Sequence, residues 1–309
     1  MNYRVRNLFG ILAVQNQKHT APICAGDDGL LVKAKGIVIA GPTKPLLRWA
    51  GSKSKLVPNL SKYWLEKRHS RYVEPFAGSA SLFFSVCPEF ALLSDINADL
   101  IETYIAVRDH PRAVHNRLTR LKKCKQAYYR IRSQDTERMG ALDRAARFIY
   151  LNRFCFNGIY RTNLAGHFNV PYAPTKTGSI PDWDSFFATA KTLKRAIIVA
   201  SDFESITRNM IKKHDFVYLD PPYAVANRRI FRQYGPNTFG LDDIDRFKRA
   251  LHRINDLGAS FVASYALSPE SRHVFDDWHT QRIATTRNVS GFSKHRRKAI
   301  EVIATNIHN

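Results

Sequence analysis

An apolar run that stops at two consecutive prolines constrains the fold of this chain more than any other feature. Phe216-Val217-Tyr218-Leu219 leads directly into Asp220-Pro221-Pro222-Tyr223. A short, continuous apolar run predicts a buried strand of a parallel sheet. The prolines fix the backbone behind it and remove two donors, so nearby carbonyls stay available as acceptors. A carboxylate, such carbonyls and a flat aromatic ring suit binding of an exocyclic amine on a planar base. A strand-ending turn with an N-capping aspartate is the alternative.

Other short strands alternate with helices along the chain, whose 309 residues can bury a sizeable core. This alternation predicts an α/β fold with a doubly wound, mostly parallel sheet. We predict further strands at Arg71–Val73, Ala91–Leu93, Ala196–Ala200, Ser260–Ser264 and Ala299–Ala304, and helices at Leu56–Trp64, Ser81–Val86 and Leu100–Val107.

A basic, helical stretch interrupts this pattern from about Pro111 to Asn157, and a loop-like segment rich in Gly, Asn and Pro follows it to Gly178. Residues before the Gly41-Pro42 break are poorly patterned, although Leu30–Ile39 could form one strand. We therefore predict an N-terminal extension at 1–43, an α/β domain formed by 44–108 and 190–309, and a helical insertion at 109–189.

The charge of the chain indicates a polyanionic partner. Lys and Arg number 48 against 26 Asp and Glu, a formal net charge of +22. Such an excess favours nucleic acid over a membrane surface as the partner. Basic residues gather, among tyrosines and phenylalanines, in Arg117–Arg132, Arg228–Arg232 and Lys294–Lys298. Any one of these clusters could instead be an ordinary solvated face.

The cysteine pattern and hydropathy argue against metal, disulfides and membrane insertion. The four cysteines lie far apart without paired spacing, at Cys24, Cys87, Cys124 and Cys155. No apolar run reaches the ~18 residues that a membrane span needs. The apolar segment Leu8–Val14 follows two arginines but has no small-residue cleavage site. We expect a cytoplasmic, nucleoid-associated protein that binds neither a metal nor a membrane.

A glycine turn and an aspartate after the next strand form a second candidate site. Gly78 and Ser79 follow a predicted strand and precede a helix, where a Rossmann-like fold brings backbone close to a ligand. Asp95 comes 17 residues after Gly78, near the ~20 expected for a carboxylate that accepts both hydroxyls of a ribose. A helix N-cap is the alternative role for Asp95.

Together these motifs resemble the Dam family of DNA adenine methyltransferases, over about Lys44 to Ile303. The motifs occur in the family's order: Trp49-Ala50-Gly51-Ser52-Lys53, Glu74-Pro75-Phe76-Ala77-Gly78-Ser79, Ser94-Asp95-Ile96-Asn97 and Asp220-Pro221-Pro222-Tyr223. Tyr150–Arg161 and Gly166–Tyr172 are similar to its recognition region. The resemblance implies a Rossmann-like methyltransferase sheet with an inserted helical target-recognition domain, S-adenosylmethionine as methyl donor, and the 6-amino group of adenine in double-stranded DNA as acceptor.

The resemblance also implies a role for individual residues. Those expected at the cofactor are Trp49, Lys53, Phe76, Ala77, Gly78, Ser79, Asp95, Asp202, Phe203 and Asp220. Asp202-Phe203 would bind the cofactor's adenine, with a strand-end cap as the alternative. Those expected to be catalytic are Asp220, Pro221, Pro222 and Tyr223. Two positions depart from the family: Ala80 replaces a usual glycine and adds a methyl near the cofactor, and Arg48 replaces a frequent lysine.

For methyl transfer, the target base must leave the helix and stack on Tyr223, with alignment rather than covalent catalysis as the main need. Phe156 either fills the gap in the stack or belongs to the core. Arg161 is the candidate for bidentate contact with guanine, which favours a GATC-like target. The predicted DNA contacts are Arg48, Arg153, Phe156, Asn157, Ile159, Arg161, Asn169, Pro171 and Lys176. We expect a monomer, with a dimer on DNA as the alternative.

Three competing functions remain at this level. Methylation of the 4-amino group of cytosine uses the same geometry, although serine is more common there at the position of Asp220. A non-catalytic DNA-binding protein would not need Trp49, Asp95 and the intact tetrapeptide Asp220-Pro221-Pro222-Tyr223. RNA methylation lacks an RNA-binding signature in this chain. A restriction system, a phage and a housekeeping pathway are equally compatible with the motifs.

Overall fold

The computed structural model describes residues 43–307, except 67, 164, 174–177, 225–238 and 287–297. The possible strand at Leu30–Ile39, the predicted DNA contact Lys176 and the basic cluster Arg228–Arg232 therefore lie outside the described residues. So do all residues of the cluster Lys294–Lys298 except the last.

A seven-stranded sheet forms the centre of the described chain, in the order β3-β2-β1-β4-β5-β7-β6. The strands are β1 (Arg71–Glu74), β2 (Ala91–Asp95), β3 (Ala196–Ala200), β4 (Asp215–Leu219), β5 (Ser260–Ala266), β6 (His279–Thr286) and β7 (Lys298–Thr305). The first five are mutually parallel, and β7 pairs antiparallel with both β5 and β6. The strand order reverses between β1 and β4, so the predicted doubly wound, Rossmann-like class is confirmed.

Two differences from the predicted strands have a simple cause. The strand β6 was not predicted, because it is an edge strand whose described side chains are mostly exposed and carry little apolar signal. β5 continues two residues beyond Ser264, because Tyr265 and Ala266 pair with Val302 and Glu301 of β7. Pairing partners far along the chain set both features.

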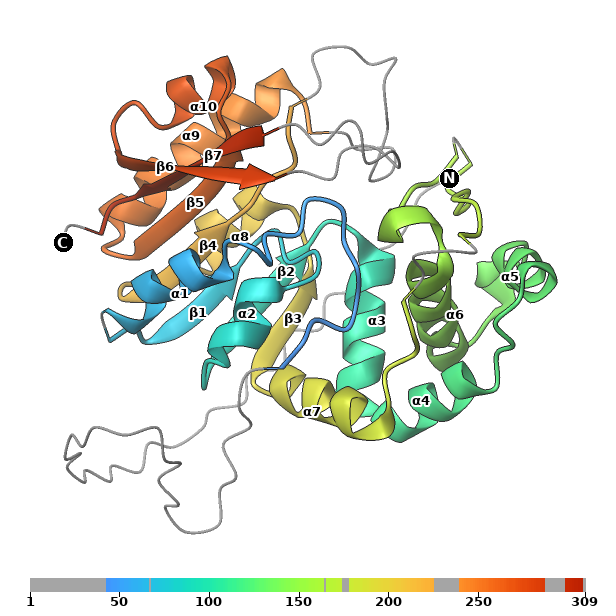
Figure 1. The fold of residues 1–309 in the computed structure, drawn as a ribbon. Coiled ribbons are helices and arrows are strands. Elements are labelled where there is room, and N and C mark those ends of the chain that lie inside the picture. Colours follow the sequence, from blue (N-terminus) through green and yellow to red (C-terminus); the bar gives the residue numbers. More distant parts are fainter. Residues whose placement is uncertain are drawn as a thin grey trace, which may run out of the picture. The chain divides into compact units, whose positions relative to one another are not determined.

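Helices cover both faces of the sheet (Figure 1). Side chains alternate along the strands: Tyr72 and Phe216 belong to one buried cluster, and Val73 and Val217 to the other. The first cluster lies under α1 (Val57–Leu65), α2 (Ser81–Val86), α3 (Ala98–Asp109) and α7 (Trp183–Leu193). The second lies under α8 (Phe203–Asn209), α9 (Leu241–Asp256) and α10 (Pro269–Val274).

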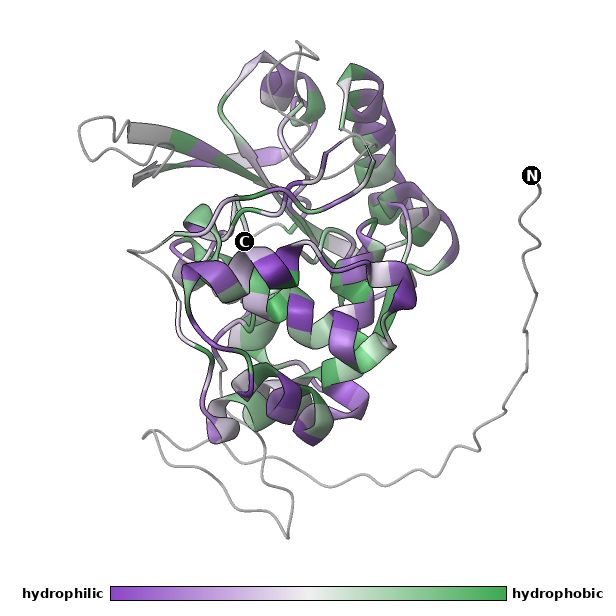
Figure 2. Ribbon diagram, turned by 90° about the vertical axis from the view of Figure 1, so that its right-hand side faces the viewer, coloured by the Kyte–Doolittle hydropathy of each residue, from purple (hydrophilic) through white to green (hydrophobic). Residues whose placement is uncertain are grey.

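The helices carry both hydrophobic and hydrophilic residues, as the mixed green and purple along them in Figure 2 shows. In α9 the buried residues recur every three or four positions and include Ile244, Phe247, Leu251 and Ile254. This spacing places them on one stripe that packs against the sheet. No helix in the described part of the chain is long and apolar enough to span a membrane.

The predicted insertion is helical, with α4 (Pro111–Thr119), α5 (Lys125–Arg132), η1 (Thr136–Arg138), α6 (Ala141–Phe154) and η2 (Phe156–Gly158). Ile149 and Tyr150 of α6 share one buried cluster with Leu100 and Tyr104 of α3. The insertion is thus joined to the sheet domain by a continuous core. The predicted boundary after residue 189 falls inside α7, and the division into domains stays a prediction.

Candidate active site

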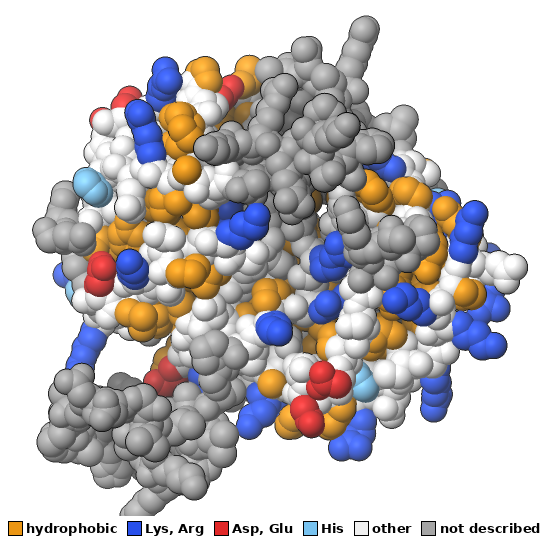
Figure 3. Space-filling view, in the orientation of Figure 1, with side chains coloured by type: hydrophobic (Ala, Val, Ile, Leu, Met, Phe, Trp, Pro, Cys, Tyr) orange, Lys and Arg blue, Asp and Glu red, His pale blue; other side chains and the backbone are white. Residues whose placement is uncertain are grey.

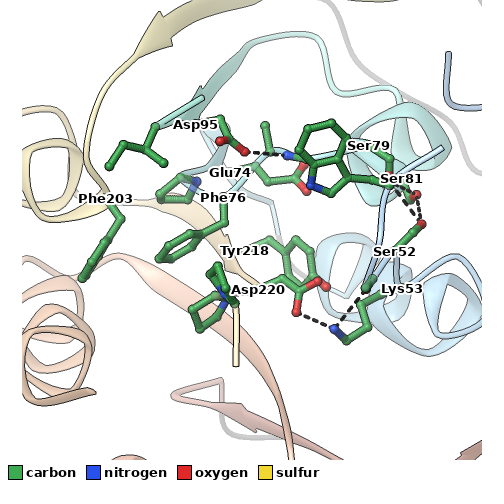
Figure 4. A pocket seen from close by; sticks show the side chains of 18 of the residues that line it. Ser52, Lys53, Glu74, Phe76, Ser79, Ser81, Asp95, Phe203, Tyr218 and Asp220 are labelled. Atoms are coloured by element: carbon green, nitrogen blue, oxygen red, sulfur yellow. Dashed lines mark hydrogen bonds and ion pairs between the residues drawn. The ribbon is translucent and has the colours of Figure 1, made fainter. Parts of the chain in front are cut away.

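One cavity of about 730 Å³ opens at the carboxyl ends of the parallel strands, next to the reversal of strand order. In open α/β sheets this edge is the usual ligand site. Figure 4 shows its side chains converging from β1, β2, β4 and the segment before α1. The cavity brings together all the residues predicted for the cofactor and for catalysis: Trp49, Lys53, Phe76, Ala77, Gly78, Ser79, Asp95, Asp202, Phe203, Asp220, Pro221, Pro222 and Tyr223.

The turn after β1 needs glycine at position 78. Gly78 has φ +46°, and a Cβ added there would lie 2.8 Å from Cδ1 of Trp49. Its N–H donates to Oδ2 of Asp95 at 2.9 Å, and its carbonyl accepts from the Tyr104 hydroxyl at 2.7 Å. The backbone is therefore anchored on both sides while the indole of Trp49 packs directly over it.

Asp95 ends β2 and points at this turn. Its Oδ1 accepts from the Asn97 N–H at 2.9 Å. Burial raises the pKa of Asp95, and the N–H groups of Asn97, Gly78 and Ile96 oppose the rise. Each carboxylate oxygen has about two acceptor positions, so both can still accept from a ligand's hydroxyls. The helix N-cap foreseen as an alternative is supplied instead by the Asn97 side chain, which accepts from the Leu100 N–H.

Ala80 does not occupy the position that we expected. Its side chain is buried and is not among the described residues that line the cavity. Its backbone is left-handed, with φ 49° and ψ 39°, at the start of α2. Alanine in place of glycine at position 80 therefore adds backbone strain, because a left-handed backbone costs a non-glycine residue roughly 1–2 kcal/mol. It does not place a methyl group beside a ligand in the cavity.

Two phenylalanines and an ion-pair network form the end of the cavity next to α8. Phe76 and Phe203 stack with their ring centroids 5.0 Å apart. Asp202 caps α8 by accepting from the Glu204 N–H, so the strand-end cap is present. Its Oδ1 also accepts from Arg246 at 2.5 Å, and that guanidinium lies 4.9 Å from the centre of the Phe203 ring. Asp202 therefore caps α8 and also lines the cavity, so the cap does not exclude binding of an adenine ring by Asp202 and Phe203.

Asp220 extends from the end of β4 into the cavity. Its Oδ1 accepts from Lys53 at 2.6 Å and from the Ser264 hydroxyl at 3.0 Å. Its other oxygen, Oδ2, accepts no hydrogen bond from the described residues. Burial raises the pKa of Asp220, and the ammonium of Lys53 opposes the rise. One oxygen is thus held in place while the other remains available to an amine.

Lys53 links the glycine of the segment before α1 to the residues after β4. Its ammonium also donates to the Gly51 carbonyl at 3.2 Å and to the Tyr223 hydroxyl at 3.3 Å. Burial alone would lower its pKa, but the Asp220 carboxylate, with Tyr223 and Glu301 nearby, raises the pKa above the ordinary value. Lys53 lines the cavity, and its ammonium contacts two residues of the segment Asp220–Tyr223.

Several polar side chains of the site were given no role in the sequence prediction. Glu74, at the end of β1, is buried and accepts from the Tyr72 hydroxyl at 2.9 Å; burial raises its pKa well above the ordinary range. The hydroxyls of Ser52 and Ser81, also without a predicted role, form a closed triangle with that of Ser79, which was predicted at the cofactor; its sides are 2.9–3.1 Å. Glu301 is buried beside Tyr223. A charged residue within an otherwise apolar strand was the available signal for Glu74 and Glu301.

The predicted recognition loop is partly preorganised. Nε of Arg161 donates to Oδ1 of Asn169 at 2.7 Å, and the backbones of Thr162 and Phe168 pair in an isolated antiparallel β-bridge. The two terminal nitrogens of Arg161 form no hydrogen bond with the described residues. Phe156 is 42% exposed, so it does not belong to the core. The neighbouring Asn157 is exposed too and left-handed, with φ 55°.

The other predicted DNA contacts differ in exposure. Pro171 is exposed and Ile159 half-buried. Arg153 donates its guanidinium to the carbonyls of Leu46 and Pro45, and burial lowers its pKa. It therefore ties α6 to the segment before Trp49. Nη1 of Arg48 is buried without a partner among the described residues. Their contacts with DNA stay predictions.

Two further observations concern the basic surface and the residues that could bind a metal. Figure 3 shows Lys and Arg side chains spread over the viewed face, several of them on the side of the insertion helices. The described residues contain no group of three or more His, Cys, Asp or Glu arranged to hold a metal ion.

Comparison with known proteins identifies the family. Residues 49–290 match the D12 class N6 adenine-specific DNA methyltransferases. The type II methyltransferase M1.LlaDCHI of Lactococcus lactis is 31% identical over 86% of this chain and 96% of its own length. M.MjaIII of Methanocaldococcus jannaschii is 33% identical over 72% and 83% of the two chains, and the DNA adenine methylase of Vibrio cholerae 31% over 84% and 95%. With the glycine turn, Asp95 and the tetrapeptide meeting in one cavity, the chain belongs to the D12 class of N6 adenine-specific DNA methyltransferases.

Proposed function

We propose that this chain transfers a methyl group from S-adenosylmethionine to the 6-amino group of an adenine flipped out of double-stranded DNA, at a GATC-like site. The observation that carries the proposal is the convergence of Trp49, Asp95 and Asp220 on one cavity. A protein that only binds DNA has no need for such a cavity. The family favours adenine over the 4-amino group of cytosine, and DNA over RNA.

The residues present fit S-adenosylmethionine. Gly78 brings backbone close to the cavity where a Cβ would collide with Trp49. The carboxylate of Asp95 suits ribose hydroxyls, and Phe76 with Phe203 offers apolar rings for a planar base. The half-buried carboxylates of Asp95 and Asp220 line the cavity and favour a cationic ligand. When bound, this cofactor supplies a methyl group on a positively charged sulfur.

Asp220 acts on the amine to be methylated. Oδ1 is fixed by Lys53 and Ser264, so Oδ2 can accept one hydrogen of the adenine amine. The carbonyl of Pro221 accepts the other in the proposed arrangement. Two such acceptors aim the nitrogen lone pair, which is otherwise delocalised into the ring, and alignment of this kind accounts for much of the barrier reduction in a two-substrate reaction.

The target base stacks on Tyr223 after it leaves the helix, since it cannot be reached inside a duplex. Phe156 is exposed at the start of η2 and is the candidate to fill the gap left in the stack. Its position outside the core supports this role.

Arg161 reads a guanine in the major groove in this proposal. Asn169 holds its Nε, which leaves the terminal nitrogens for bidentate contact with O6 and N7. Arg48 is half-buried, and we propose that the accessible part of its side chain contacts DNA. We propose a monomer that acts in the cytoplasm on the nucleoid; a dimer on DNA is the alternative.

The test is expression in a host without endogenous DNA methylation, followed by mapping of modified bases along the genome. We expect N6-methyladenine at one short motif that contains GATC or part of it. The Asp220→Ala variant, expressed to the same level, serves as the inactive control. Methylated cytosine, or no modified base with folded wild-type protein, would contradict the proposal. Methylated adenine at an unrelated motif would refute only the GATC-like target.

A further inference from the structure

We propose that Glu301 is a positioning residue for methyl transfer, which holds the ring of Tyr223 in the orientation that receives the target base. This inference rests on the proposed function and adds a residue from the last strand of the sheet, β7. Glu301 is 3% exposed, and Oε1 accepts a hydrogen bond from the Tyr223 hydroxyl at 3.1 Å. Oε2 lies 3.5 Å from the same hydroxyl.

The strand pairing fixes where this carboxylate lies. Glu301 stands opposite Ala266 of β5 and Ile283 of β6, so it lies inside the sheet with a paired strand on either side. Because side chains alternate along a strand, Glu301 is directed to the face that carries Tyr223. A strand therefore holds the acceptor, while Asp220–Tyr223 follows β4 as an irregular segment.

Tyr223 is held by contacts with both β5 and β7. Tyr265 of β5 packs edge-on against its ring, with centroids 5.2 Å apart and an interplanar angle of 86°. The hydroxyl of the same Tyr265 accepts from the Ala224 N–H at 2.7 Å and so fixes the backbone behind the ring. Glu301 holds the far end of the ring through its hydroxyl. Without that bond, the hydroxyl would lose its carboxylate acceptor and keep the longer contact from Lys53, 3.3 Å.

The charge at Glu301 also belongs to this network. Lys53 donates to both Asp220 and the Tyr223 hydroxyl, and its ammonium lies 5.4 Å from the ring centre. The hydroxyl of Tyr223 thus accepts from Lys53 and donates to Glu301. A buried carboxylate without hydrogen bonds is costly, so its presence in an apolar strand is explained by this arrangement. The direction of the Tyr223 hydroxyl is set by a cation on one side and an anion on the other.

The experiment compares Glu301→Gln with Glu301→Met at saturating DNA and cofactor. Glutamine keeps a carbonyl acceptor, whereas methionine keeps the volume and removes the acceptor. We expect Glu301→Met to lower the single-turnover methyl-transfer rate at least about tenfold, the effect of a lost charge-assisted hydrogen bond. The KM for S-adenosylmethionine should stay within about threefold, because the residue does not line the cofactor end of the cavity. Glutamine should restore most of the rate.

A double-mutant cycle with Tyr223→Phe tests whether Glu301 acts through the hydroxyl. In the Tyr223→Phe background, which keeps the ring and removes the hydroxyl, Glu301→Met should change the rate by no more than about twofold. The matched control is Thr305→Val. Thr305 is a buried polar residue of the same strand whose hydroxyl donates to the Phe261 carbonyl, away from the cavity. It should retain the wild-type rate.

Equal loss in Glu301→Gln and Glu301→Met, or a tenfold loss that persists in the Tyr223→Phe background, would overturn the positioning role. Unchanged activity of Glu301→Met would overturn it as well. If Glu301→Met does not fold, as judged by circular dichroism and thermal melting, Glu301→Gln and Tyr223→Phe still test it: glutamine must retain the rate and phenylalanine must lose it. Wild-type activity is measured in parallel, and only its absence would refute the proposed function.

Discussion

Replacing Gly78 with alanine gives a quantitative test of the cofactor turn. The added Cβ would lie 2.8 Å from Cδ1 and 3.1 Å from Nε1 of Trp49, and ordinary contact begins at 3.4 Å, a difference of about 0.6 Å. The backbone cannot retreat, because the Gly78 N–H is bound to Asp95 and its carbonyl to the Tyr104 hydroxyl. The indole must therefore move, against its stacking with Tyr160 at 5.8 Å.

Two costs follow from this geometry. The left-handed backbone at φ +46° costs alanine roughly 1–2 kcal/mol of folding stability, or a few degrees in Tm for a chain of this size. Displacement of Trp49 should weaken S-adenosylmethionine binding at least about tenfold, ~1.4 kcal/mol. Isothermal titration calorimetry measures the affinity, and differential scanning calorimetry measures the stability.

Gly258→Ala separates the two costs. Gly258 also has a left-handed backbone, with φ +74°, but lies in the turn between α9 and β5, and its added Cβ would approach only the flexible Lys213 side chain, at 3.3 Å. We expect similar destabilisation and unchanged cofactor affinity. Cofactor affinity in folded Gly78→Ala equal to that in Gly258→Ala would refute the proposed contact between the turn, Trp49 and the cofactor.

Three further predictions concern catalysis, recognition and pH. Asp220→Ala should lower methyl transfer roughly 100-fold or more even at saturating S-adenosylmethionine, because the acceptor acts mainly in the transition state; recovery of the rate at high cofactor concentration would make Asp220 a cofactor ligand only. Arg161→Ala should chiefly relax specificity, by roughly 1–3 kcal/mol at one base pair, as measured by binding to cognate and substituted duplexes; equal losses on both would indicate a phosphate contact. The ion pairs of Glu204 with Arg246 and Arg208 lower its pKa from 4.5 to about 2, so they stabilise the fold above pH 4.5 and this contribution is lost as the pH falls toward 2. Glu204→Gln should therefore flatten the dependence of Tm on pH in that window, and an unchanged profile would contradict the assignment.

The sequence by itself determined where the five parallel strands lie and which residues at their carboxyl ends meet at the cavity. Gly78, Asp95 and Asp220 each follow or end a short apolar strand, and parallel strands place their carboxyl ends at one edge of the sheet. Local pattern and a general rule of topology were therefore enough to bring these residues together. The same reasoning predicted the helical insertion, because its periodicity and its basic charge can be read directly from the chain.

Tertiary structure alone decided how the side chains at this edge are paired. Lys53 meets Asp220 from 167 positions away, and Glu301 meets Tyr223 from 78 positions away. Local pattern does not encode such contacts, because they depend on the register of β7 against β5 and on the direction in which each side chain leaves its strand. For the same reason Arg153, which is basic and lies in the predicted recognition region, could not be distinguished in sequence from a surface arginine. Its guanidinium is turned inward because the carbonyls of Leu46 and Pro45, about a hundred residues earlier, lie within its reach.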